Sequence, residues 1–222
     1  MIGKEFPSEI KEYVDQKTGN VVKQLTSNGS NNHHFYFTDN SFSADDKEIY
    51  FLSDRSSSKP EVYNLFKMEL ETGQMVQLTN EPEGVAPSFH TKTPESDIVV
   101  YVSGRQLKKL DVSTLETTVL YEEKPGIQLG HPHISADKKY IGMARNERVP
   151  IERGANYRGF KETMYATKRG GSPLLVWMER KYLMFLKIHI GWAIFNFHLP
   201  IAAWPPFVMK VHGTSSINEY GF

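Results

Sequence analysis

The sequence contains no cysteine, which excludes a disulfide framework and any metal site built on thiolates. Its formal net charge is zero, so we expect no electrostatic attraction to nucleic acid or to an anionic membrane. The first residues carry no apolar segment of the kind that forms a secretory signal. These absences fit a reducing compartment, and we expect a cytoplasmic location.

Long uninterrupted hydrophobic runs are also missing, although the last quarter of the chain is strongly apolar. The most apolar stretch, 183–208, is interrupted by Lys187 and contains the helix breakers Pro200, Pro205 and Pro206. A membrane-spanning helix needs about 20 consecutive apolar residues. We therefore expect no membrane partner, with a membrane-facing ending as the alternative.

Acidic residues almost vanish beyond residue 169. Of the 26 Asp and Glu residues only Glu179 and Glu219 lie there, while all three tryptophans do. Such a change of composition predicts two regions. Residues 1–168 should form the folded part, and residues 169–222 should form no domain of their own.

An internal repeat runs through the first region. Copies of an apolar residue, a polar turn and an alternating strand begin at Phe42, Phe89 and Ile134, as in F-S-A-D-D-K-E-I-Y-F and I-S-A-D-K-K-Y-I-G-M. Further short strands with turns such as E-T-G-Q follow the first two copies, and T-G-N-V-V-K-Q-L-T at 18–26 fits the end of an earlier copy. Four short strands per about 45 residues is typical of a β-propeller blade.

The fold class that follows is all-β, with about three propeller blades. An ordinary β-sandwich with fortuitous self-similarity is the alternative, but three evenly spaced copies favour the propeller.

The motifs V-V-K-Q-L-T, N-N-H-H-F-Y-F-T-D-N-S-F-S-A-D-D-K-E-I-Y-F and E-T-G-Q-M-V-Q-L-T resemble the N-terminal part of the oligogalacturonate lyases. The resemblance covers about residues 12–168. It implies a seven-bladed propeller, of which this chain supplies about three blades. It also implies cleavage of pectin-derived oligogalacturonates such as digalacturonate by β-elimination, with a divalent metal, typically manganese.

Four residues are candidates for binding the substrate: His33, His34, Arg55 and Arg145. The histidines precede the first full blade, and His33 aligns with a histidine of the family pattern. An arginine can bind a uronate carboxylate through two parallel hydrogen bonds. The alternatives are strand capping for the histidines, pairing with Asp54 for Arg55, and a solvated charged loop around Arg145. No catalytic residue is assigned.

The segment Gln128-Leu-Gly-His131-Pro-His133 has the spacing of a metal-binding Gln-x-x-His-Pro-His motif in the oligogalacturonate lyases. The family motif lies in the final blade, whereas this copy lies in an early one. Gln128, His131 and His133 are therefore candidate metal ligands, and an ordinary turn at the start of a blade is the alternative.

The ending permits an unusual interpretation. If the codons for 189–199 are shifted by one base, they can spell Thr-His-Trp-Leu-Gly-His-Phe-Gln-Phe-Ser-Pro, which resembles a blade motif of the same family. The same shift over 204–222 permits Cys-His-Glu-Gly-Pro, another family motif. We therefore expect translation to leave the family reading frame near 170–172, so that 169–222 is an out-of-frame tail.

The function expected from these features is that of an oligogalacturonate lyase by descent, inactive in this chain because three blades cannot close a seven-bladed ring. The alternative is a binding module without enzymatic activity, of the Tol-associated propeller type. A serine-peptidase propeller would need a hydrolase domain, and no Gly-x-Ser-x-Gly motif is present. The sequence does not predict an oligomeric state.

Overall fold

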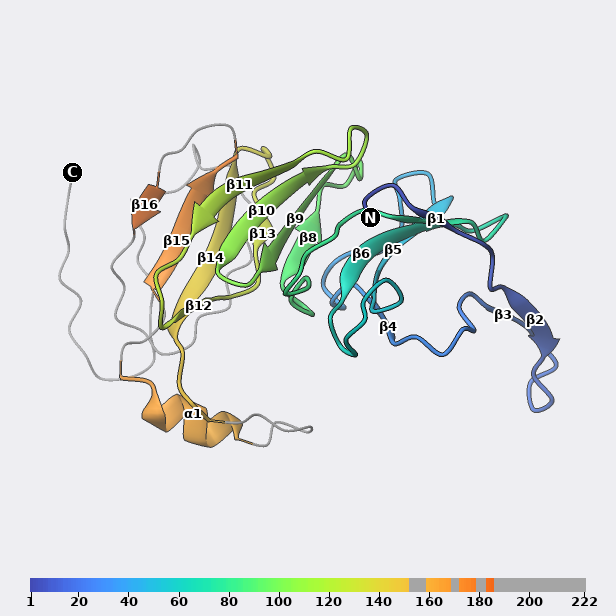
Figure 1. Cartoon of the computed structure of the whole chain (residues 1–222), viewed down its shortest axis with the longest axis horizontal. Helices are drawn as coiled ribbons and strands as arrows, with labels where there is room; N and C mark the ends of the chain where they lie inside the picture. The colour runs from blue at the N-terminus through green and yellow to red at the C-terminus, as the bar shows by residue number, and fades with distance from the viewer. Residues whose placement is uncertain (152–158, 169–171, 179–182, 186–222) are drawn as a thin grey trace.

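The computed structural model describes residues 1–151, 159–168, 172–178 and 183–185. Nearly all regular structure in these residues is β-strand. Three larger antiparallel sheets follow one another along the chain, accompanied by one small hairpin and one short helix (Figure 1). No helix among the described residues has the length and apolar character needed to cross a membrane.

The first sheet has the strand order β1-β7-β6-β5-β4. Four of its strands are consecutive in the chain, and the N-terminus adds the outermost one. Its strands are β1 (Glu5–Phe6), β4 (Asn32–His34), β5 (Glu48–Ser53), β6 (Asn64–Glu69) and β7 (Met75–Gln77).

The second sheet consists of four consecutive strands in the order β11-β10-β9-β8. They are β8 (His90–Lys92), β9 (Ile98–Ser103), β10 (Gln106–Asp111) and β11 (Thr117–Glu122). This up-and-down order repeats that of β4 to β7, as the sequence repeat predicts.

The third sheet has the order β12-β14-β15-β16, and β13 also pairs with β14. Its strands are β12 (Ile127–Leu129), β13 (His133–Ile134), β14 (Tyr140–Glu147), β15 (Ser172–Trp177) and β16 (Leu183–Phe185). Strands β15 and β16 therefore come from the predicted tail. Apart from Met178, the rest of that tail lies outside the described residues, so the predicted boundary at 168 stays a prediction.

Two smaller elements complete the description. The hairpin of β2 (Lys11–Val14) and β3 (Val21–Gln24) forms a separate two-stranded sheet, which includes the strand expected from the T-G-N-V-V-K-Q-L-T segment. The helix α1 (Phe160–Ala166) lies apart from the sheets, below the third one in Figure 1.

One tight turn recurs at the repeated motif and explains its polar residues. The Ser43 hydroxyl donates to the Asp45 carboxylate at 2.8 Å and accepts from the backbone N–H of Glu48 at 2.9 Å. Ser135 makes the equivalent pair of bonds in the third copy. In all three copies of the motif the turn contains one residue with positive φ: Asp46 in the first, Ser96 in the second and Lys138 in the third. Short polar side chains that bond to nearby backbone favour such turns, which is why the motif recurs.

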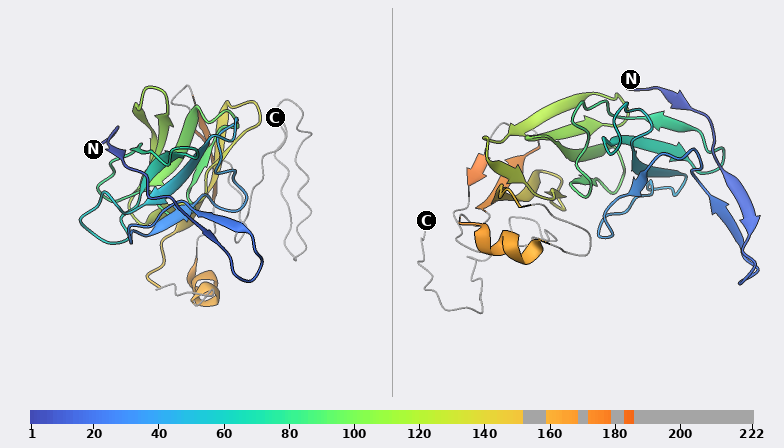
Figure 2. Two further views of the ribbon diagram at one scale, coloured as in Figure 1. Left: turned by 90° about the vertical axis from the view of Figure 1, so that its right-hand side faces the viewer. Right: turned by 60° about the horizontal axis from the view of Figure 1, so that its bottom comes forward.

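The core lies between the sheets. Along β9, Val99 and Tyr101 pack into the cluster shared with the first sheet, whereas Val100 and Val102 pack into the cluster shared with the third. Because successive side chains of a strand point to opposite faces, the central sheet buries both faces, as an inner propeller blade must. Figure 2 shows the three sheets following one another along an arc.

Candidate functional site

The candidate site lies where the edge strands β4, β8 and β13 of the three sheets come together. These strands stand at corresponding ends of their sheets, with β13 beside β8. The residues gathered there are Tyr36 and Asp39 after β4, Ser88, His90 and Thr91 at β8, and His131 and His133 at β13.

His131 links all three sheets. Its Nε2 lies 3.0 Å from the Asp39 carboxylate of the first sheet, and its Nδ1–H donates to the carbonyl of Ser88 next to the second. The same Asp39 carboxylate accepts from the Thr91 hydroxyl at 2.7 Å. The His131 ring also lies 4.5 Å from the His133 ring, centroid to centroid.

The charges of this cluster compensate each other. Burial by itself would lower the pKa of His131, but the Asp39 carboxylate and the Ser88 carbonyl outweigh burial and raise it. Burial would likewise raise the pKa of Asp39, but His131 and Thr91 outweigh burial and lower it. Both shifts favour the charged forms of the two groups, the imidazolium of His131 and the carboxylate of Asp39.

His90 has the opposite character. It is fully buried, its ring packs 4.2 Å from that of Phe35, and neither ring nitrogen has a well-formed hydrogen bond. Burial, together with the positive charge of His131, lowers the pKa of His90 to about 4. His90 is therefore neutral at physiological pH.

Both predicted substrate-binding histidines are exposed on the edge strand β4. The His33 ring meets Tyr63 edge-on at 4.8 Å, and the Nδ1–H of His34 donates to the carbonyl of Phe35. Their exposure on the edge that leads into the His131 cluster is compatible with contact to a sugar.

Arg55 lies in the interior. Its side chain is 1% exposed, and its guanidinium pairs with Glu9 at 3.0 Å while packing over the Phe51 and Phe66 rings. The alternative partner, Asp54, instead accepts from the side-chain amide of Asn31 at 2.9 Å. These contacts tie the N-terminal segment to the first sheet, so the described role of Arg55 is structural.

Arg145 is also engaged within the protein. Its guanidinium binds both carboxylate oxygens of Glu123, with Nη2 donating at 2.8 Å and Nε donating to the other oxygen. Glu123 is buried and also accepts from the Tyr121 hydroxyl at 2.9 Å. Since Glu123 follows β11 and Arg145 lies in β14, the pair joins the second and third sheets.

The predicted metal motif brings two of its three members together. His131 and His133 lie side by side, whereas Gln128 is exposed in β12 opposite Asn146. The Nδ1–H of His131 is bonded to the carbonyl of Ser88, and its Nε2 faces the Asp39 carboxylate at 3.0 Å without a well-formed hydrogen bond. Within the described residues, no three His, Asp or Glu side chains are grouped to hold a metal. Those residues therefore do not fit manganese, and no reaction step is assigned through a metal here.

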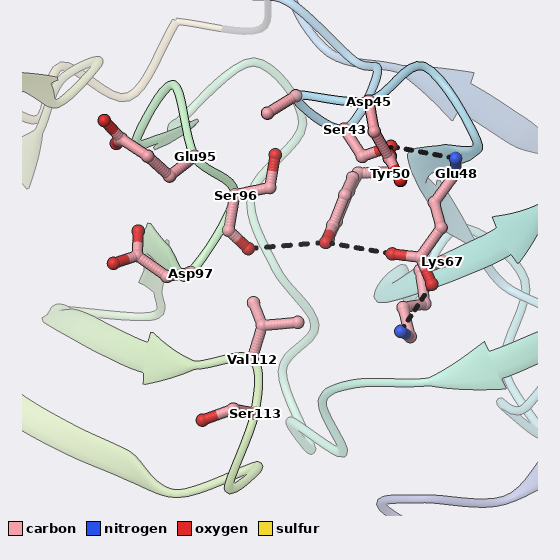
Figure 3. Close-up of a pocket in the computed structure, with 11 residues that line it drawn as sticks. Ser43, Asp45, Glu48, Tyr50, Lys67, Glu95, Ser96, Asp97, Val112 and Ser113 are labelled. Atoms are coloured by element: carbon pink, nitrogen blue, oxygen red, sulfur yellow. Dashed lines mark hydrogen bonds and ion pairs between the residues drawn. The ribbon is translucent and has the colours of Figure 1, made fainter.

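A shallow pocket of about 360 Å³ opens elsewhere, between the repeated turns of the first and second sheets (Figure 3). Its acidic lining residues are Asp45, Glu48, Glu95 and Asp97. The Lys67 ammonium in its wall is paired with Glu48 at 2.6 Å. An acidic lining of this kind repels an anionic sugar, so this pocket is not the candidate site.

Sequence reasoning missed Asp39, Thr91 and His90. His90 directly follows Phe89, where the second copy of the repeat begins, and Asp39 lies in the T-D-N segment that precedes the first copy. Their meeting depends on how the blades stack, since Asp39 and Thr91 are 52 positions apart in the chain. No local pattern carries that information.

Comparisons with known proteins identify the family. A family model described as oligogalacturonate lyase matches residues 1–168. No curated protein sequence matches the chain. Two solved structures, an oligogalacturonate lyase in complex with manganese and an oligogalacturonate lyase from Vibrio parahaemolyticus, each match with a TM-score of 0.69, 23% identity and 83% coverage of this chain.

The chain spans 48% of the length of each of these two solved lyases. At this identity the likeness shows the fold, and it confirms the predicted propeller architecture over the sandwich. The family match over residues 1–168 goes further, because it covers most of the 222 residues, and it shows that the chain belongs to the oligogalacturonate lyase family.

Proposed function

We propose that this chain derives from an enzyme that cleaves pectin-derived oligogalacturonates, such as digalacturonate, by β-elimination. The observation that carries the proposal is the match of the lyase family model to residues 1–168. The same match favours the lyase over a Tol-type binding module. The proposal includes a cytoplasmic location and the use of a divalent metal by the whole enzyme. One solved relative is an oligogalacturonate lyase in complex with manganese.

The reaction dictates what such a site must provide. A base removes the proton α to the uronate carboxylate, the bond to the leaving sugar oxygen breaks, and a carbon–carbon double bond forms. That proton is only weakly acidic because the carboxylate is already charged. A divalent cation or an arginine must therefore neutralise the carboxylate and stabilise the charge that develops.

Among the described residues, His33 and His34 are the side chains best placed to contact the sugar. Both are exposed on β4, beside the segment that leads to Tyr36 and Asp39. His131 is proposed as a positioning residue, because its Nδ1–H donates to the Ser88 carbonyl while its Nε2 faces the Asp39 carboxylate at 3.0 Å. The base is not assigned.

We also propose that the 222-residue chain is inactive by itself and that its last part is read out of frame. The chain spans 48% of the length of each of the two solved lyases. The frame proposal is supported by the change of composition near residue 169 and by the end of the family match at residue 168.

Two measurements test these proposals. Sequencing the gene across the codons for 168–173 tests the frame, and true codons that give no family motif after a one-base shift would refute it. Ultraviolet absorbance of new carbon–carbon double bonds, with digalacturonate and manganese, tests the activity. A frame-restored protein that binds digalacturonate but forms no double bonds would favour the binding module.

A further inference from the structure

The turn after β4 displays two aromatic rings. The backbone N–H of Asp39 donates to the carbonyl of Tyr36 at 2.7 Å and so closes a four-residue turn. Tyr36 is 41% exposed and Phe37 79% exposed, and their ring centroids lie 4.4 Å apart. Two large apolar side chains standing together in solvent contribute little to folding, and such patches mark binding surfaces.

This turn is held rigidly by the other two sheets. Its last residue, Asp39, accepts from Thr91 at 2.7 Å and forms the ion pair with His131 at 3.0 Å. The Tyr36 ring itself lies 5.8 Å from the His131 ring. The turn that carries the aromatic pair is therefore anchored through Asp39 before any ligand arrives, which lowers the entropy that binding must overcome.

The chemistry of the turn fits one face of a sugar ring. A galacturonate ring presents axial and equatorial C–H groups on one face, and these pack on aromatic rings while the hydroxyls and carboxylate point to water. The nearby Asp39 carboxylate faces His131 at 3.0 Å, so a protonated His131 weakens its repulsion of the anionic sugar.

We propose that Tyr36 and Phe37 form a stacking platform for one pyranose ring of an oligogalacturonate, held in place by Asp39, Thr91 and His131. The platform follows strand β4, which carries His33 and His34, and the Tyr36 ring lies 5.8 Å from the His131 ring. This inference rests on the proposed function and adds to it the residues that position the substrate.

Calorimetric titration of the full chain with saturated digalacturonate tests the platform. Phe37→Ala and Tyr36→Ala should each weaken digalacturonate binding about tenfold, because each removes one of the two aromatic rings on which the sugar would stack. Phe37→Trp should restore binding to within about threefold of the original chain. The matched control is Tyr165→Ala on α1, since Tyr165 is 80% exposed and distant in sequence from the site. That variant should bind as the original chain does.

Equal binding by Phe37→Ala, Tyr36→Ala and Tyr165→Ala would overturn the platform and leave the proposed function standing. No binding by the original chain would overturn the platform, whereas the proposed function is decided separately, by the absorbance assay on the frame-restored protein. Circular dichroism of each variant accompanies the titration. Loss of structure in Phe37→Ala would also overturn the platform, because it would give this exposed ring a structural role.

Discussion

The buried pair of Glu123 and Arg145 offers the sharpest test of how the second and third sheets are joined. Glu123 is 1% exposed, and Arg145 supplies the only cationic side chain recorded against its carboxylate within the described residues. Arg145→Met removes that cation and keeps most of the volume. Removing one partner of a buried ion pair costs about 3–5 kcal/mol of folding free energy, because the remaining charge is left without compensation.

The size of this loss depends on pH in a defined direction. Burial favours a raised pKa for Glu123, but Arg145 and its other hydrogen-bond donors outweigh burial and lower it. Without Arg145, burial dominates and the pKa rises. Protonation then relieves the buried charge, so the deficit of Arg145→Met should be largest near neutral pH and shrink as the pH falls through the raised value.

Urea unfolding followed by circular dichroism measures the effect, and Glu123→Gln combined with Arg145→Met provides the control. The double variant buries no charge, so it should be more stable than Arg145→Met alone. A loss below about 0.5 kcal/mol in Arg145→Met would contradict the reasoning. If Arg145→Met stayed folded and yet lost digalacturonate binding, Arg145 would be a substrate contact, the role for which the sequence makes it a candidate.

The other predictions concern the remaining buried ionisable side chains. The pKa of His131 is raised, so its contribution to the free energy of unfolding is complete below about pH 6.5 and is lost as the pH rises through the raised pKa. In urea unfolding, His131→Asn should therefore abolish this decrease of stability with rising pH. The pKa of His90 is lowered to about 4, so the protein should lose about 3 kcal/mol as the pH falls from 6.5 to 4, and His90→Phe should not show this loss. Arg55→Met should lower the free energy of unfolding by about 3–5 kcal/mol, because it leaves the Glu9 carboxylate without its cation. The double variant Arg55→Met, Glu9→Gln should recover part of this stability, and equal stability of the single and double variants would contradict the pairing.

Local chemistry explains why much of the fold is predictable. The Ser43 and Ser135 turns are built from bonds between residues two to five positions apart, so their sequence motif carries their geometry. The alternation of β9 likewise predicts a strand, although burial of both its faces becomes evident only when the neighbouring sheets are present.

The candidate site is less predictable because its contacts are distant in sequence. Arg55 lies beside Asp54 in the chain, yet it pairs with Glu9, 46 positions away. The sequence indicates that an arginine follows β5, but not that this arginine is buried. In the same way His131 and His133 are recognisable as a pair, while the partner that fixes His131 comes from another blade.

The most direct test of the central claim is the formation of carbon–carbon double bonds from digalacturonate in the presence of manganese. The chain as it stands and a frame-restored protein are compared by ultraviolet absorbance under the same conditions. We predict that double bonds accumulate with the frame-restored protein and not with the 222-residue chain. A folded, frame-restored protein that leaves digalacturonate intact would contradict the account.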